Sequence, residues 1–80
     1  MTLAPGDVER LLDALCADLG FCLRHAERSR LVERPPDDAA TFANEVFLAE
    51  GLNPELADRH LYRQVRDRIA EAMRQFNTQR

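Results

Sequence analysis

Apolar residues recur at the spacing of an α-helix in several stretches of the chain, and each stretch predicts a helix with one buried face. We expect helices over residues 5–19, from Asp37 or Asp38 to residue 50, and over residues 54–76. The positions predicted to be buried include Leu12, Leu15, Phe42, Val46, Val65 and Ile69. No segment shows the alternation typical of a strand. The predicted fold class is therefore all-α, a compact bundle of three to four helices with a long C-terminal helix.

Two glycines are predicted to end helices. Gly20 and Gly51 each follow a helical stretch, at the position where the backbone often turns left-handed. Phe21 and Leu52 come next, and each is placed to fold back on the last turn as an apolar closure. The two glycines therefore set the C-terminal boundaries of the first and third predicted helices.

The segment over residues 22–33 is the least regular of the four candidates. It is rich in helix-forming residues, but its apolar positions are ragged. It should end by Arg34, because a residue that precedes proline is disfavoured in the α region, and Pro35 and Pro36 follow. We expect a second helix here, with a loop as the alternative.

The last helical stretch is long for a globule of this size. Asn53 is expected to cap it and Pro54 to occupy its first position. Its 23 positions would span about 34 Å, against a diameter of about 30 Å for a compact chain of this length. Either the helix bends near residues 57–59, or its end projects and packs on a second copy, with Met73 and Phe76 as the dimer contact.

Two large side chains fall outside the predicted core. Tyr62 lies at the edge of the apolar stripe of its helix, and its hydroxyl is expected to reach water. Leu48 points away from the inner face of its helix, at about 100° per residue. A lone exposed leucine is common, but beside other apolar atoms it would mark a contact surface.

Length and composition indicate the number of domains and the expected location of the protein. The chain has 80 residues, so residues 1–80 are expected to form one helical domain with a thin core. All eleven basic residues are Arg, a bias of GC-rich genomes that suggests a bacterial source. Neither a signal peptide nor a membrane span is visible. We therefore expect a cytoplasmic protein in which Cys16 and Cys22 are reduced thiols rather than a disulfide framework.

No constellation of residues points to an enzyme. Glycine-rich phosphate loops and paired zinc-binding motifs are absent from the sequence. Cys16, Cys22, His25 and His60 are residue types that bind zinc, but their spacing does not match structural zinc sites. Cys22 and His25 could meet as nucleophile and base, yet no third, orienting group is identifiable. We expect a non-enzymatic protein with no cofactor and no metal.

Charge is segregated along a chain whose net charge is −3. Residues 35–56 carry acidic side chains and no basic ones, whereas the last helix is rich in Arg. An acidic face suits a small module that binds a basic protein, because charge complementarity steers association. We expect an inhibitor, an antitoxin or immunity-type protein, or an adaptor. The residues assigned to this acidic face are Asp37, Asp38, Glu45 and Leu48.

The basic residues of the last helix define the alternative. Arg59, Arg63, Arg66 and Arg74 fall within an arc of about 80° when a helix turns by about 100° per residue. Such a strip could bind a phosphate backbone in a nucleic-acid-binding helical dimer. The net negative charge argues against this function, so nucleic acid is the less favoured partner.

Overall fold

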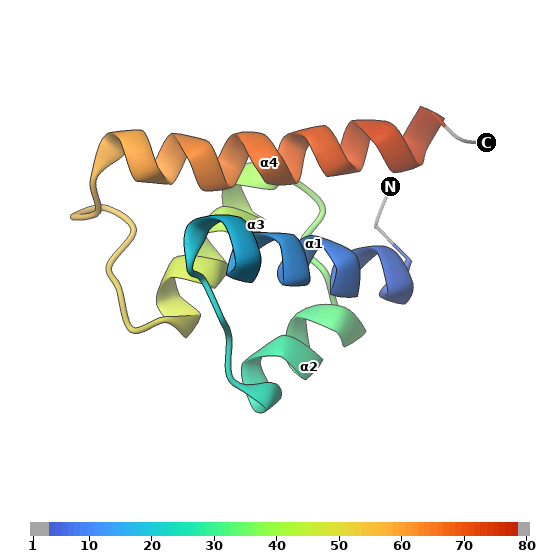
Figure 1. The fold of residues 1–80 in the computed structure, drawn as a ribbon, viewed down its shortest axis with the longest axis horizontal. Coiled ribbons are helices and arrows are strands. Elements are labelled where there is room, and N and C mark those ends of the chain that lie inside the picture. The colour runs from blue at the N-terminus through green and yellow to red at the C-terminus, as the bar shows by residue number, and fades with distance from the viewer. Residues whose placement is uncertain (1–3, 79–80) are drawn as a thin grey trace.

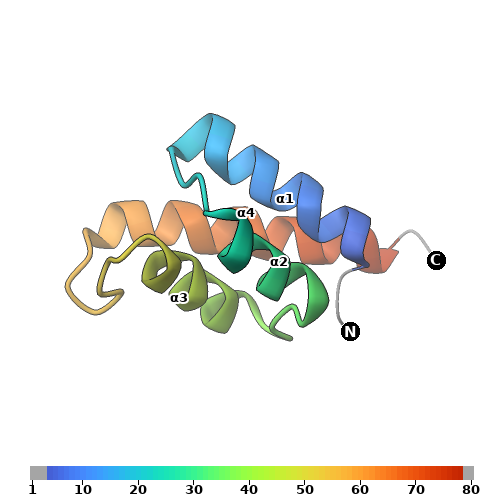
Figure 2. The same cartoon turned by 90° about the horizontal axis from the view of Figure 1, so that it is seen from below.

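The computed structural model describes residues 4–78, and the side chains of residues 4–75, as an all-α bundle with a long C-terminal helix. The helices, in chain order, are α1 (Pro5–Leu19), α2 (His25–Glu33), α3 (Ala39–Ala49) and α4 (Arg59–Thr78). Helix α4 runs the length of the molecule and packs against α1 and α3, while α2 packs against α1 (Figure 1). Seen from below, α1 and α3 lie on the two sides of α4 (Figure 2). The predicted fold class is confirmed.

The core is formed where α1, α3 and α4 meet. All six side chains named from the sequence as core residues are buried. The buried apolar residues are Val8, Leu11, Leu12, Leu15, Phe21, Leu31, Phe42, Ala43, Val46, Phe47, Val65 and Ile69. Helix α2 contributes only Leu31 to this set, because most of its side chains are polar and remain at the surface. The short helix α2 is therefore held mainly by its contacts with α1.

Helix α1 ends at Gly20 as predicted. The φ angle of Gly20 is 79°, which is left-handed backbone that a residue without a Cβ adopts readily. The N–H of Phe21 donates to the carbonyl of Leu15, so the chain folds back on the last turn. The Phe21 side chain is 5% exposed, and its ring centroid lies 4.9 Å from that of Phe47. This closure therefore fixes the end of α1 against α3.

Helix α3 begins at an aspartate cap. The Asp38 carboxylate accepts hydrogen bonds from the backbone N–H of Thr41 at 3.0 Å and from its hydroxyl at 2.7 Å. These two bonds stabilise the charged form, and they lower the pKa of Asp38 below its ordinary value of 3.8. The helix ends before Gly51, whose φ is 77°. The backbone closes as it does after Gly20, since the N–H of Leu52 donates to the carbonyl of Phe47 at 2.9 Å, but the Leu52 side chain is 44% exposed.

Helix α2 is shorter than the predicted segment. It begins at His25 rather than at residue 22, and Arg24 in extended conformation precedes it. It ends at Glu33, two residues before Pro35, as the proline pair requires. Residues 22–24 are kept out of the helix because Cys22 is bonded back to α1, as described below.

The long C-terminal stretch is broken in the region where a bend is expected. Asn53 Oδ1 accepts the N–H of Glu55 at 2.9 Å, but this cap starts only a turn. A second cap, Asp58, accepts the N–H of His60 at 2.8 Å, and α4 begins at Arg59. The predicted helix start at Pro54 is therefore wrong by five residues. The chain uses residues 54–58 to turn from α3 into α4, and dimer formation stays a prediction.

Candidate protein-binding surface

Three leucines stand out because they are the exposed large apolar side chains of the described residues. Leu48 is 56% exposed, Leu52 44% and Leu56 83%. Leu48 lies in the last turn of α3, and the other two lie in the segment that leads to α4. Their proximity in the chain follows from Gly51, which ends α3 and turns the backbone before Leu52 can pack inward. An exposed apolar group of this kind is typical of a contact surface.

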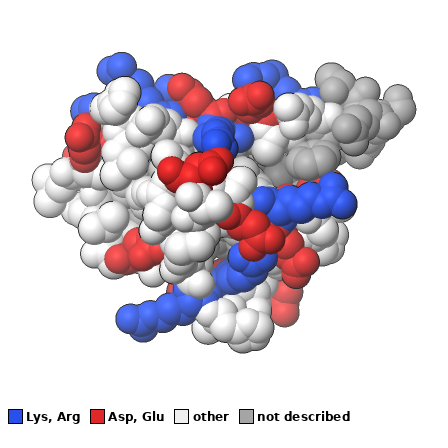
Figure 3. Space-filling view, viewed as in Figure 1, with Lys and Arg blue, Asp and Glu red and all other residues white. Residues whose placement is uncertain are grey.

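A shallow hollow connects Leu48 and Leu52. It has a volume of about 610 Å³ and is lined by Leu48, Gly51, Leu52, Asn53, Pro54 and Glu55. Leu56 directly follows Glu55 in the chain. In Figure 3 the left edge of the molecule, over the segment that follows α3, is mostly uncharged with isolated acidic groups. We call Leu48, Leu52 and Leu56, together with Glu50 and Glu55, the leucine surface.

The charge around the leucine surface is negative. Residues 35–58 include six carboxylates and no Lys or Arg. Asp38 and Asp58 are used as helix caps, and Glu45 lies 3.6 Å from Arg30. Glu50 and Glu55 have no ion pair among the described residues. Their charges therefore remain uncompensated beside the exposed leucines.

Glu50 has a second unusual property. Its Oε1 atom is shielded from solvent and has no hydrogen-bond partner in the described chain. Glu50 lines a hollow of about 280 Å³ next to Leu48, together with Cys22 and Arg24. A buried carboxylate oxygen without a donor is unfavourable, because it has lost water without gaining a protein hydrogen bond. A cationic group placed here by a partner would supply one.

The structure distributes the predicted acidic face along the length of α3. Asp37 and Asp38 lie at its N-terminal end, while Leu48 lies near its C-terminal end, about 15 Å further along the axis. Glu45 lies between them and lines a different hollow, beside Arg30. Leu48 is exposed, as expected, but its neighbours are the leucines and carboxylates of residues 50–56. The sequence signal for this grouping is two apolar residues on either side of the Asn53 cap: Leu52, predicted to close the third helix, and Leu56, predicted to lie in the last helix.

The arginine strip lies on α4, and two of its four members are engaged within the chain. The Arg59 guanidinium donates to the carbonyls of Pro54 and Ala57 and lies 5.0 Å from the centre of the Tyr62 ring. Arg66 lies 3.4 Å from the carboxylate of Asp67. Over the rest of α4, Figure 3 shows basic and acidic groups interspersed. For Arg63 and Arg74, the structure shows no contact of this kind with the described residues.

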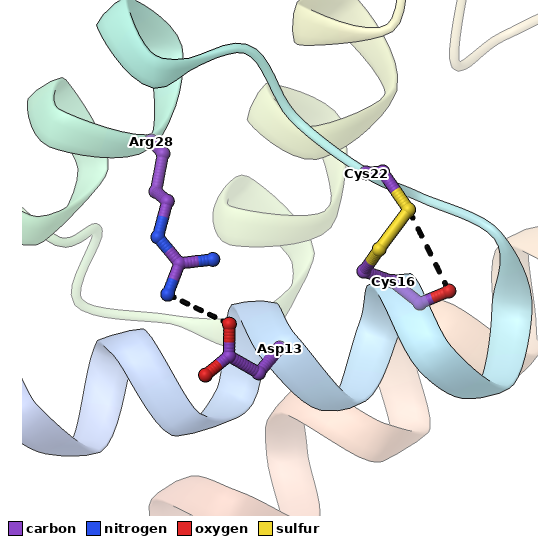
Figure 4. Close-up of a disulfide and its surroundings, with 4 residues drawn as sticks. All are labelled: Asp13, Cys16, Cys22 and Arg28. Carbon is purple, nitrogen blue, oxygen red and sulfur yellow. Dashed lines mark hydrogen bonds and ion pairs between the residues drawn. A yellow bond between two sulfur atoms is a disulfide. The ribbon is translucent and has the colours of Figure 1, made fainter.

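The two cysteines form a disulfide, which overturns the expectation of reduced thiols. The reversal at Gly20 brings their Cα atoms to 4.3 Å, a separation that a disulfide spans (Figure 4). The Cys22 Sγ also lies 3.7 Å from the carbonyl oxygen of Cys16. Neither sulfur is a thiolate in this state, so neither can act as nucleophile or zinc ligand. Sequence spacing alone gave no indication of the pairing, because it depends on the turn that follows α1.

The remaining candidates are not brought together. His25 is the first residue of α2 and His60 lies in the first turn of α4, and both are exposed. No three His, Cys, Asp or Glu side chains in the described part of the chain are grouped to hold a metal ion. Met73 is partly buried against this chain's own core. The other predicted dimer contact, Phe76, has its side chain outside the described residues.

Comparison with known proteins finds no family model that matches the chain, and no curated protein or solved structure with a significant match. Within residues 4–78, no helix is both long and apolar enough to cross a membrane. Function therefore has to be argued from the surface described above.

Proposed function

We propose that the protein is a non-enzymatic binding module, of the inhibitor, antitoxin, immunity or adaptor type, that binds a basic partner protein through the leucine surface. The observation that carries the proposal is the exposure of Leu48, Leu52 and Leu56, because the other large apolar side chains among the described residues are buried at least in part. The partner segment that fits is an amphipathic helix with leucine-like residues on one face and Lys or Arg beside them.

Both parts of the surface contribute to this choice of partner. Burial of a leucine side chain is worth about 1.5–3 kcal/mol when it is complete, and these three leucines still expose much of their area. Glu50 and Glu55 add negative charge, and neither forms an ion pair within the described part of the chain. Apolar anchors supply affinity, whereas the carboxylates select for a basic segment and raise the rate of association. An acidic or uncharged polar partner without apolar side chains would supply neither the apolar anchors nor the basic groups.

A cytoplasmic location is part of the same proposal. In that compartment a disulfide is transient rather than permanent. A basic partner of the nucleic-acid-binding type would meet the module there. Homodimer formation is not required, since the leucine surface lies within one chain.

The direct test is binding of a synthetic peptide. We would use a fluorescein-labelled amphipathic helix of about 16 residues, with Leu on one face and Lys on the other, and measure anisotropy between about 0.02 and 0.5 M salt. A scrambled peptide and one with Glu in place of Lys serve as controls. We expect binding of the basic helix only, with an affinity that falls as salt rises.

Variants then locate the site. Leu52→Ser together with Leu56→Ser should weaken binding by about tenfold or more, since both side chains are solvent-exposed and their loss leaves the fold intact. Glu55→Arg should weaken binding and reduce its salt dependence. Glu33→Arg is the matched control, because Glu33 is exposed and lines a different hollow, between α1 and α2. Equal effects of Glu33→Arg and Glu55→Arg, or equal binding of all three peptides, would overturn the proposal.

A further inference from the structure

The two residues of the Cys16–Cys22 disulfide differ in exposure. Cys22 is exposed, in the non-helical segment between α1 and α2, whereas Cys16 is partly buried in the last turn of α1. Figure 4 shows the bond at the end of α1, where the chain passes toward α2. Which sulfur is attacked in thiol–disulfide exchange depends on access. An incoming thiolate therefore reaches Cys22 first.

The surface next to Cys22 also has room for a thiol. The hollow of about 280 Å³ that Cys22 lines also contains Arg24 and Glu50. Arg24 has no ion pair among the described residues, so its charge attracts a thiolate. The carboxylate of Glu50 opposes that attraction. The two charges therefore act on an approaching thiolate with opposite signs.

From these observations we propose that the disulfide is a thiol–disulfide exchange site, at which an external dithiol attacks Sγ of Cys22. This inference stands apart from the proposed function, because it needs no partner on the leucine surface. The substrate class is a dithiol, either a small molecule or a protein with two cysteines. The outcome is interconversion of a closed and an open form of the segment between α1 and α2.

The exchange is balanced as follows. A thiolate of the dithiol bonds to Sγ of Cys22, the Cys16–Cys22 bond breaks, and its electron pair leaves with Cys16, which takes a proton from water. The second thiolate of the dithiol then attacks the first sulfur of the dithiol, which is bonded to Sγ of Cys22 in the mixed disulfide, and this bond breaks. The electron pair of the broken bond leaves with Cys22, which also takes a proton. Two electrons pass from the dithiol, which becomes a disulfide, to the two cysteines, which become thiols.

Contacts that do not involve sulfur also hold the chain around the bond, so we expect its opening to be reversible. Phe21 is buried against Phe47 and keeps the chain folded back on α1. Arg28 ties α2 to α1 by an ion pair with Asp13 at 2.8 Å (Figure 4). It also donates a hydrogen bond to the carbonyl of Glu9 at 3.3 Å. Because these contacts do not involve sulfur, the two cysteines stay near each other after reduction.

The test maps the first mixed disulfide. The oxidised full chain is mixed with glutathione, quenched with acid at early times and alkylated. Tandem mass spectrometry of the tryptic peptide over residues 11–24 then locates glutathione and the alkyl group. We expect glutathione on Cys22 and the alkyl group on Cys16, in an excess of about tenfold. Equal amounts on the two cysteines, or more on Cys16, overturn the proposal.

Two further measurements separate exchange from a purely structural disulfide. The reduced protein should keep its helical circular dichroism and close again in oxidised glutathione. Unfolding on reduction, or no reduction of the folded chain by glutathione, would show that the bond is structural only.

Charge variants test the hollow itself. Arg24→Gln should slow reduction at low salt by about two- to fivefold and Glu50→Gln should speed it, because they remove opposite charges beside Cys22. Arg63→Gln, an exposed arginine on α4, should leave the rate unchanged. If Arg24→Gln and Arg63→Gln give the same rate, the proposed role of the hollow is wrong.

Discussion

The hydroxyl of Tyr62 donates a hydrogen bond to Oδ1 of Asn44 at 2.8 Å and joins α4 to α3. The sequence predicted a rim residue whose hydroxyl reaches water, and the structure shows in addition that this hydroxyl has a partner within the chain. The ring of Tyr62 also lies 5.5 Å from that of Phe47, so the side chain is held at both its polar and its apolar end. Tyr62 is therefore a structural link of the bundle rather than a free rim residue.

Removal of this hydroxyl should destabilise the bundle measurably. Tyr62→Phe keeps the ring but leaves Asn44 Oδ1 without its donor, at a cost of about 1–2 kcal/mol. Chemical denaturation followed by circular dichroism gives the free energy of unfolding. In a double-mutant cycle with Asn44→Ala, a coupling energy of about 0.5–1.5 kcal/mol is expected. A coupling energy near zero would show that the bond does not stabilise the native state.

The contrast between two side chains of α3 tests the division between core and contact surface. Phe42 is fully buried, so Phe42→Ala should cost about 3–5 kcal/mol and unfold much of the protein. Leu48 is 56% exposed, so Leu48→Ala should change stability by no more than about 0.5 kcal/mol. Thermal melts of both variants provide the measurement. A large loss in Leu48→Ala would mean that this leucine belongs to the core.

Local signals in the sequence were sufficient for α1 and α3. Gly20 and the Asp38 cap act within a few residues, and so the boundaries they indicate agree with the structure. Local signals do not determine where α4 starts, because Asn53 and Asp58 are both good caps. The one that begins α4 is set by how the chain must turn to place Val65 and Ile69 in the core.

The candidate site depended more on tertiary structure than the helices did. Leu48 was identified from its angle on the helix, but Leu52 and Leu56 were assigned to a closure and to a helix that does not include them. The prediction of reduced thiols is wrong because it rested on the expected compartment, whereas the disulfide depends on the turn at Gly20 that brings Cys16 and Cys22 together. Both errors concern the segments between helices, where packing rather than periodicity decides the structure.

Gly51 should tolerate replacement poorly for a reason confined to its backbone. Its φ is 77°, while a Cβ added at this position would meet no atom within 4 Å. The cost of Gly51→Val is therefore conformational, about 1–3 kcal/mol, since a β-branched residue is disfavoured in left-handed backbone. Gly51→Asn should cost less, because asparagine tolerates this conformation better. Thermal melts that place the valine variant level with the wild type would contradict this.

The Asp38 cap should make part of the stability depend on pH. Because its pKa is lowered in the folded chain by the bonds to Thr41, the stabilisation is complete above the ordinary carboxyl pKa and is lost as pH falls through the folded pKa. At pH 7, Asp38→Ala should lower the melting temperature by about 4–8 °C. The difference from wild type should shrink as pH falls below 3.8 and through the lowered pKa of the folded chain. Asp38→Asn, an uncharged cap, is the control and should keep most of the stability at pH 7.

Nucleic acid should not bind this chain appreciably. Affinity for a duplex comes largely from phosphates neutralised by Lys or Arg, and the net charge of the chain is −3. Of the four strip arginines, Arg59 is bonded to backbone carbonyls and Arg66 is paired with Asp67, so few cations are free to contact phosphate. An electrophoretic mobility shift with mixed DNA and RNA at low salt should show no retarded band. A shift that Arg63→Glu together with Arg74→Glu removes would instead establish the basic strip as the binding surface.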